Sequence, residues 1–140
     1  MSILLDANAL LAVLVAEPAM DRVLSLIRQG NTAMTGANIA EVFDVGIRRK
    51  GLSPARMTEL VEPLFAGPIS CIPIEQELAR PAGLLRGSRY HRSKSRISLA
   101  DAVLLAAARP ADKIATSDSG VLALAAELGI KTIELPPSGG

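Results

Sequence analysis

Four acidic residues occupy positions from which they could do chemistry: Asp6, Glu41, Asp101 and Asp118. Asp6 directly follows the apolar run 3–5, and Asp118 lies two residues beyond another short apolar run. A fold that gathers these acids makes a strongly negative pocket, which is tolerated only if cations neutralise it or protons are taken up. Oxygen ligands favour hard ions such as magnesium or manganese. The sequence therefore indicates a metal-dependent phosphodiester enzyme.

The bulk properties fit one compact domain. The chain has 140 residues, and its hydrophobic content of 49% argues against disorder. The formal net charge of +1 neither demands nor excludes a polyanionic partner. No secretory signal follows Met1, and no stretch reaches the roughly 18 apolar residues that span a bilayer. We expect a cytoplasmic protein without a membrane segment.

The single cysteine, Cys71, excludes an internal disulfide framework. It lies in a short apolar run, residues 69–73, which ends in proline. Such a run predicts a buried thiol in a strand rather than a reactive cysteine.

Short apolar runs alternate with helical patterns along the chain. The predicted strands are residues 3–5, 32–34, 69–72, 114–116 and 132–135. The predicted helices are residues 8–16, 19–29, 37–50, 54–65, 75–85, 98–109 and 120–128, with a kink at Pro81. This alternation predicts an α/β fold, with a mainly parallel central sheet flanked by helices on both faces. Residues 1–135 are predicted to form a single domain and residues 136–140 a flexible tail.

In folds of this kind, ligands bind beyond the carboxyl ends of the strands. Asp6 and Asp118 both lie just past the end of a predicted strand. Glu41 and Asp101 both lie early in predicted helices, where helices leave that same edge of the sheet. The topology therefore allows all four acids to converge.

Each acid also has an ordinary structural alternative. Asp6 could cap the first helix, although Asn8 could do so instead. Asp101 completes a capping-box pattern with Ser98, and Asp118 could be a helix cap or a turn residue. Glu41 could simply be a solvated side chain that interacts favourably with the dipole of its helix. The joint placement of four acids on one predicted edge is harder to explain by these separate roles.

Four segments together resemble the PIN-domain nucleases. Residues 3–11 are similar to the opening of that family, and residues 37–42 to its second acidic motif. Residues 97–102 are similar to the third and most specific motif, and residues 115–118 match the fourth. Their order and spacing agree over essentially the whole chain, and its size resembles the VapC-type toxins of toxin–antitoxin modules.

The resemblance implies a magnesium- or manganese-dependent endoribonuclease that works as a homodimer. It also implies a small antitoxin whose tail occupies the active-site groove. The family roles carry over to Asp6, Glu41, Asp101 and Asp118 as metal-binding carboxylates, with Asn8, Thr116 and Ser117 as polar residues around them. The chain departs from the family pattern at Pro81 and in the unusually basic segment after Leu85.

Charge is segregated in spite of the small net value. Residues 78–100 contain no acid, and residues 48–50 form a second basic cluster. We expect the longer segment to bind RNA phosphates, although it could be a solvated loop or an antitoxin surface. With only 2% aromatic residues, a base-stacking platform is excluded. The predicted RNA-binding residues are Arg86, Arg89, Arg92, Lys94 and Arg96.

Three other classes compete with a ribonuclease. A haloacid-dehalogenase-like phosphohydrolase needs a second acid two residues after the first, where this chain has Asn8. A response-regulator receiver needs an aspartate at the end of a central strand, and none occurs near Ser53 and Pro54. A catalytically silent RNA-binding or interaction module with the same fold is the most serious alternative. His91 is the only histidine, so a histidine pair of the metal-free ribonuclease kind is impossible.

Overall fold

The computed structural model describes residues 1–138, so Gly139 and Gly140 lie outside the described residues. The strands are β1 (Ile3–Leu5), β2 (Thr32–Thr35), β3 (Ile69–Ile72), β4 (Lys113–Thr116) and β5 (Lys131–Glu134). Within the described residues they form one sheet in the order β3-β2-β1-β4-β5, and every neighbouring pair is parallel. The predicted parallel α/β fold is confirmed.

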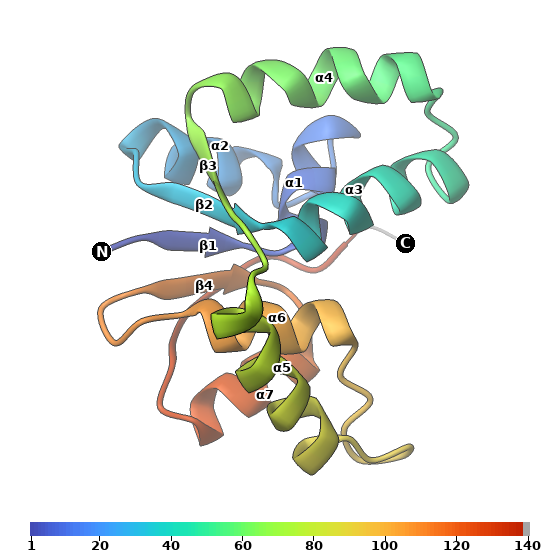
Figure 1. Ribbon diagram of the computed structural model, residues 1–140. Helices are drawn as coiled ribbons and strands as arrows, with labels where there is room; N and C mark the ends of the chain where they lie inside the picture. Colours follow the sequence, from blue (N-terminus) through green and yellow to red (C-terminus); the bar gives the residue numbers. More distant parts are fainter. Residues whose placement is uncertain (139–140) are drawn as a thin grey trace.

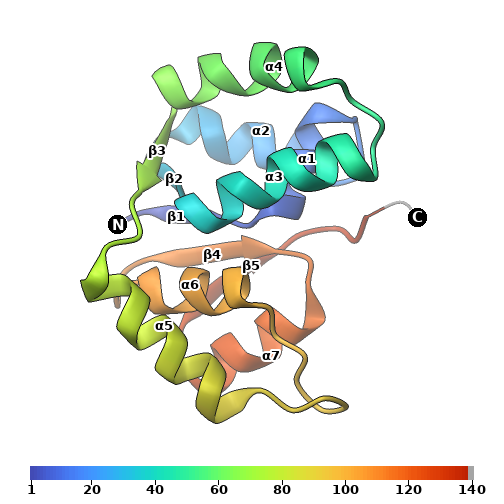
Figure 2. The ribbon, with the colours of Figure 1, turned by 45° about the vertical axis from the view of Figure 1, so that its right-hand side comes forward.

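The helices cover both faces of this sheet (Figures 1 and 2). They are α1 (Ala7–Leu14), α2 (Met20–Gln29), α3 (Gly36–Arg48), α4 (Pro54–Ala66), α5 (Gln76–Arg89), α6 (Leu99–Ala107) and α7 (Ser119–Glu127). The first four lie on one face, and α5, α6 and α7 lie on the other. No helix among residues 1–138 is long and apolar enough to cross a membrane.

The central strand β1 joins two hydrophobic cores. Successive side chains of a strand point to opposite faces. Leu5 therefore belongs to the core under α1 to α4, and Leu4 belongs to the core over α6 and α7. Both leucines are fully buried. This double burial fixes the register of β1 and so fixes where Asp6 emerges from the sheet.

Several helix ends differ from the sequence prediction, and two of the differences bear on the site. Helix α1 begins at Ala7 because Asp6, not the exposed Asn8, caps it. Helix α5 continues through Pro81 to Arg89, because a proline removes only one backbone donor and this ring is exposed. The first part of the basic segment is therefore helical rather than a loop.

The prediction of a buried Cys71 is wrong, because its side chain is exposed. The residue does lie in a strand, but β3 is an edge strand that pairs only with β2. Ser70 is exposed beside it, and only Ile69 of this strand is buried. Of the predicted tail, residues 136–138 are exposed and form neither helix nor strand.

Candidate functional site at the carboxyl edge of the sheet

All four predicted acids come to one edge of the sheet. Asp6 and Asp118 follow the neighbouring strands β1 and β4, which pair in parallel. Glu41 lies in the first half of α3, and Asp101 lies in the first turn of α6. Their charges act on one another: Asp101 and Asp118 both raise the pKa values of Asp6 and Glu41, in addition to the larger effect of burial.

Asp6 is the most deeply buried of these acids, with only 4% of its surface exposed. Its Oδ1 accepts the Ala9 N–H at 2.8 Å and caps α1, while its Oδ2 accepts the hydroxyl of Thr116. Burial raises the pKa of Asp6 to about 6, against the opposing effect of these two hydrogen bonds. An acid of this kind is costly to ionise unless a cation approaches it.

Thr116 links the first and the last acid. Its hydroxyl donates to Asp6 Oδ2 and accepts the Asp118 N–H at 3.0 Å. The side chain is completely buried, and its hydrogen bond to Asp6 is shielded from water, while the one from Asp118 is partly buried. The other two predicted polar neighbours differ, since Asn8 is exposed and Ser117 is half-buried. Within residues 1–138, neither of their side chains forms a hydrogen bond to the acids.

Asp101 and Asp118 both act as helix caps. Asp101 forms a capping box with Ser98, whose Oγ accepts the Asp101 N–H at 3.0 Å and whose N–H donates to Asp101 Oδ2 at 3.4 Å. Asp118 Oδ1 accepts two backbone N–H groups and caps α7. Burial and the neighbouring Asp118 raise the pKa of Asp101. The structural alternatives seen in the sequence are thus realised together with the clustering of charge.

Glu41 is positioned by a neighbour that sequence reasoning missed. Asn38 is completely buried, and its Nδ2 donates to Glu41 Oε1 at 3.5 Å. The Thr35 hydroxyl, which caps α3, holds the Asn38 amide oxygen at 3.2 Å. Burial, followed by Asp101, raises the pKa of Glu41. A threonine that directly follows the predicted strand 32–34, three residues before an asparagine, was the available signal.

The donor set has the chemistry of a site for a hard divalent ion. Every candidate ligand is a carboxylate, and three of the four have raised pKa values that a nearby cation would lower. Within residues 1–138, however, no three such side chains are placed so that they could hold one ion together. Several of the carboxylate oxygens instead accept hydrogen bonds from backbone N–H groups at the starts of the helices. Binding an ion would therefore require at least one carboxylate to rotate.

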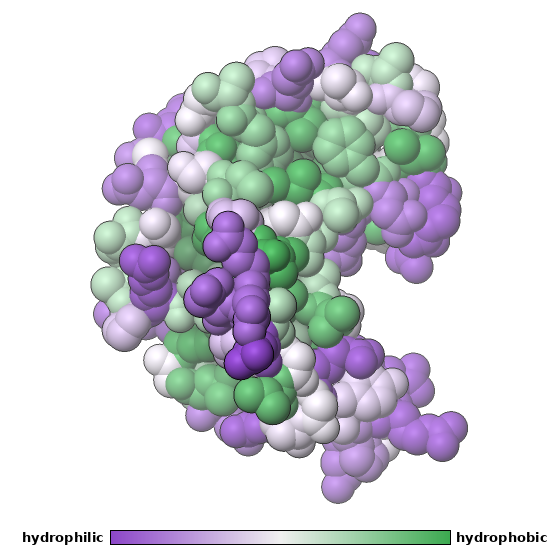
Figure 3. Space-filling model, viewed as in Figure 1, coloured by the Kyte–Doolittle hydropathy of each residue, from purple (hydrophilic) through white to green (hydrophobic). Residues whose placement is uncertain are grey.

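The predicted RNA-binding residues fall into two groups. Arg86 and Arg89 belong to the last turn of α5 and already have partners: Arg86 Nε donates to Ile97 O at 2.9 Å, and Arg89 pairs with Glu127 at 2.6 Å. The remaining predicted RNA-binding residues are exposed on the loop between α5 and α6: Arg92, Lys94 and Arg96. Figure 3 shows the molecule hollowed at the carboxyl edge, with hydrophilic side chains gathered on both sides of the hollow.

A parallel α/β sheet with acidic side chains at its carboxyl edge defines a class of domain. Comparison with known proteins names the family. The chain belongs to the PIN domain family, whose model matches residues 3–128. No curated protein matches the chain.

Several solved structures share this fold. FitAcB from Neisseria gonorrhoeae is 23% identical with a TM-score of 0.63, over 94% of this chain and 96% of that one. VapBC2 from Rickettsia felis, bound to a DNA fragment from its promoter, is 13% identical with a TM-score of 0.66, over 97% and 100%. VapC20 from Mycobacterium tuberculosis, a sarcin–ricin loop cleaving toxin, is 13% identical with a TM-score of 0.62, over 96% and 90%.

Proposed function

We propose that this chain is a divalent-metal-dependent endoribonuclease and the toxin of a type II toxin–antitoxin pair. The observation that carries the proposal is the convergence of four carboxylates from separate elements at one sheet edge. Such a cluster suits a metal-dependent phosphodiesterase, because metal ions activate water and neutralise phosphate charge. The RNA-cleaving VapC20 toxin shares the fold and so supports this reading. RNA and an antitoxin as partners agree with action in the cytoplasm.

The chain's own residues would divide the work. Asp6 and Asp101 would bind Mg²⁺ or Mn²⁺ directly, and Glu41 and Asp118 would complete the site or orient the attacking water. Thr116 keeps Asp6 in place through its hydroxyl, and the buried position of Asp6 would limit the access of bulk water to an ion bound there. The hydrogen bonds that hold Asp6 before the substrate arrives lower the cost of ordering this residue during the reaction.

The two sides of the hollow would bind the RNA backbone. Arg92 and Lys94 extend from the loop after α5 on one side, with Arg96 next to them on the same loop. On the other side, the end of α3 carries Arg48, which is paired with Asp44, and the exposed Arg49. Cations that flank an acidic centre can neutralise the phosphates on either side of the scissile bond. Direct contacts by Arg86 and Arg89 are less favoured, since both have partners within the chain.

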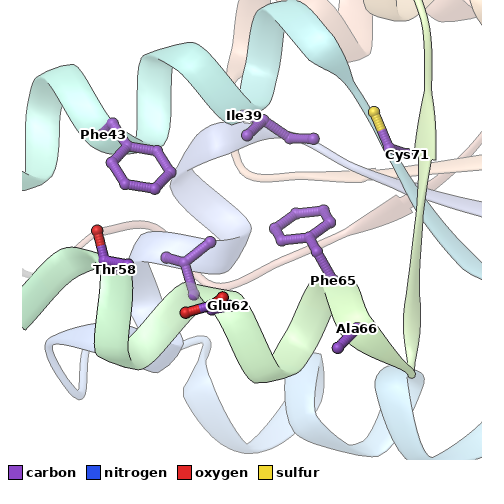
Figure 4. A pocket seen from close by; sticks show the side chains of 8 residues that line it. Ile39, Phe43, Thr58, Glu62, Phe65, Ala66 and Cys71 are labelled. Atoms are coloured by element: carbon purple, nitrogen blue, oxygen red, sulfur yellow. The ribbon is translucent and has the colours of Figure 1, made fainter.

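An apolar groove between α3 and α4 would receive the antitoxin (Figure 4). Its volume is about 500 Å³, and Ile39, Phe43 and Phe65 line it together with the exposed Cys71. Exposed apolar concavities of this kind mark interaction sites. Because α3 carries both this groove and Glu41, a bound segment would lie beside the acidic edge. Another neighbour with this fold is a toxin–antitoxin complex from Klebsiella pneumoniae, which favours such a partner.

We also propose a homodimer. Leu84 on α5 and Leu99 at the start of α6 are 75% and 59% exposed, which is unusual for leucine. A second copy could cover this apolar surface. Sedimentation of wild type and of a Leu84→Arg variant tests the dimer, because a charge there would dissociate it.

Incubation with total RNA, with magnesium and with excess EDTA, tests the nuclease. The wild type should cut RNA only with magnesium, and Asp6→Asn should not cut it in either condition. Cleavage that survives EDTA would contradict the metal-dependent mechanism. Arg56→Gln is a suitable control, because Arg56 lies on the exposed face of α4 and its side chain, among residues 1–138, pairs only with Glu59.

The second candidate is a catalytically silent RNA-binding module. It is favoured by the capping roles of Asp6, Asp101 and Asp118 and by the lack, within residues 1–138, of three side chains ready to hold an ion. Such a module would bind RNA with equal affinity in magnesium and in EDTA, and would leave it intact. A phosphohydrolase of the haloacid-dehalogenase kind is disfavoured, because Asn8 is exposed at the position that needs the second acid.

A further inference from the structure

A small hollow adjoins the acidic edge, between the loop after α5 and the start of α7. Its volume is about 200 Å³, and both Asp101 and Asp118 line it. We propose that this hollow binds the base next to the scissile phosphate and that it selects guanine. The inference rests on the proposed ribonuclease function and adds a substrate preference to it. The other residues of the lining are Ser95, Arg96, Ile97, Gly120 and Val121.

The walls of the hollow are anchored on both sides. Ile97 and Val121 supply an apolar surface and are themselves only 6% and 1% exposed. On the loop, Arg86 Nε holds the Ile97 carbonyl at 2.9 Å. His91 and Ser95 close the loop with a pair of backbone hydrogen bonds of 2.8 and 3.0 Å. The hollow is therefore part of the folded structure rather than a gap beside an unsupported loop.

The size of the hollow suits one ring system. Pockets for drug-sized ligands measure roughly 300–1,000 Å³, so a hollow of about 200 Å³ takes a base but not a whole nucleotide. Gly120 keeps this space open at the start of α7. A Cβ atom at that position would lie 3.2 Å from Asp118 Oδ1.

Two charged groups of opposite sign face the hollow. Arg96 donates through Nε to the Arg92 carbonyl, and within residues 1–138 its terminal nitrogens form no hydrogen bond or ion pair. Asp118 Oδ1 accepts the Gly120 and Val121 N–H groups at 2.8 and 3.0 Å. Its Oδ2 has no partner among the described residues. One fork of donors and one acceptor are thus available to a ligand.

Guanine matches this pair better than the other bases. Arginine binds the adjacent O6 and N7 acceptors of guanine with two hydrogen bonds. The N1–H and N2–H groups of the same base can donate to a carboxylate. Uracil offers no two adjacent acceptors to arginine, and adenine offers an acceptor next to a donor. Cytosine does have two adjacent acceptors, O2 and N3, but only its N4 amino group can donate to the carboxylate, whereas guanine donates through both N1 and N2. Because Asp118 lies both in the hollow and in the acidic cluster, a base held here leaves its phosphate at the cluster. With the base bound, Asp118 would support the ion through its charge alone, and Glu41 would orient the attacking water.

Cleavage of short RNAs that differ at a single nucleotide tests the preference. The wild type should cut the RNA with guanine at one position next to the cleaved bond at least about 10-fold faster than the other three, measured as kcat/KM. Arg96→Gln should reduce this ratio to within about threefold, and so should Arg96→Lys, because lysine lacks the fork. Arg92→Gln removes the same charge from the same loop outside the hollow. It should slow all four RNAs alike and keep the ratio.

Binding of mononucleotides in EDTA separates this inference from the nuclease proposal. GMP should shift the NMR signals of the Gly120 and Val121 amides at lower concentration than UMP, and Arg96→Gln should remove the difference. This measurement decides the inference even if no RNA is cut, a result that would refute only the nuclease. Equal binding of GMP and UMP, a preference for another base, or a guanine preference that survives Arg96→Gln would overturn the guanine subsite.

Discussion

Replacing Asp6 with asparagine should stabilise the metal-free protein. Burial raises the pKa of Asp6 from 3.8 to about 6. A shift of about 2 pKa units corresponds to a cost of about 3 kcal/mol for the ionised group in the folded state. The variant removes this charge and keeps an amide oxygen that can accept the Ala9 N–H, and asparagine caps helices as well as aspartate does.

The pH dependence follows from the direction of the shift. Between about pH 4 and pH 6 the folded state binds this proton and the unfolded chain does not, so stability falls as the pH rises. The full cost is present above about pH 6 and is absent below about pH 4. Rearranging the hydrogen bond to Thr116 costs the variant about 1 kcal/mol. A net gain of about 2 kcal/mol remains at pH 8, or about 6 °C in melting temperature for a chain of this size.

Thermal melts in EDTA at pH 8 and pH 5 measure this gain. At pH 5 the advantage of the variant should shrink by about 1.5 kcal/mol, because Asp6 of the folded wild type is then largely protonated. Magnesium should raise the melting temperature of the wild type more than that of the variant, since an ion that binds the folded state stabilises it.

Asp112→Asn is a matched control for which the opposite change in melting temperature is expected. Asp112 is also buried, at 8% exposure. Burial raises its pKa, but hydrogen bonds from the Arg109 and Ser2 N–H groups outweigh that effect and leave the pKa lowered. This variant should therefore melt at a lower temperature. If Asp6→Asn also melts lower than wild type in EDTA at pH 8, Asp6 is a structural cap and the reasoning about the cluster is wrong.

Three further outcomes are expected. Asp101→Asn should lower the rate of RNA cleavage at least about 100-fold, since several kcal/mol of charge stabilisation are lost. Single-turnover assays on one RNA measure this rate, and an unchanged rate would exclude a direct role of Asp101 in cleavage. Reversing the charges of Arg92 and Lys94 should weaken RNA binding and flatten its salt dependence. A salt titration by fluorescence anisotropy checks this. If the salt dependence of RNA binding equals that of the wild type, the loop is a contact surface for the antitoxin instead. Gly46→Ala should destabilise the protein by about 1–3 kcal/mol, because the new Cβ would lie 2.6 Å from the sulfur of the buried Met57. Urea unfolding measures this loss, and Gly46→Ala combined with Met57→Val should recover part of it.

The sequence was sufficient for the elements that have a strong local signal. Residues 3–5 are apolar throughout because β1 is buried on both faces, and such a run identifies a central parallel strand. Ser53 and Pro54 mark the start of α4 because they supply the cap and the first helical residue. Helices and strands in this order lead to a parallel α/β sheet with few alternatives.

The wrong prediction for Cys71 and the unforeseen partners of Arg86 and Arg89 share a physical origin, because both depend on which elements pack against one another. Cys71 lies in a predicted strand, but its exposure depends on β3 being at the edge of the sheet. Arg86 and Arg89 lie in a basic run, but their partners are Ile97 and Glu127, from other parts of the chain. No local pattern reports such long-range contacts.

The sequence by itself determined the four acids and their place after strands or early in helices, since both follow from local patterns of 3 to 15 or so residues. Only the tertiary structure decided which hydrogen bonds the carboxylate oxygens of those acids accept. Pairing of β1 with β4 sets the buried Thr116 hydroxyl between Asp6 and the Asp118 backbone, and the packing over that edge raises the pKa of Asp6. A pKa depends on the solvent and charge around a group in three dimensions, and these come from residues 110 positions apart in the chain.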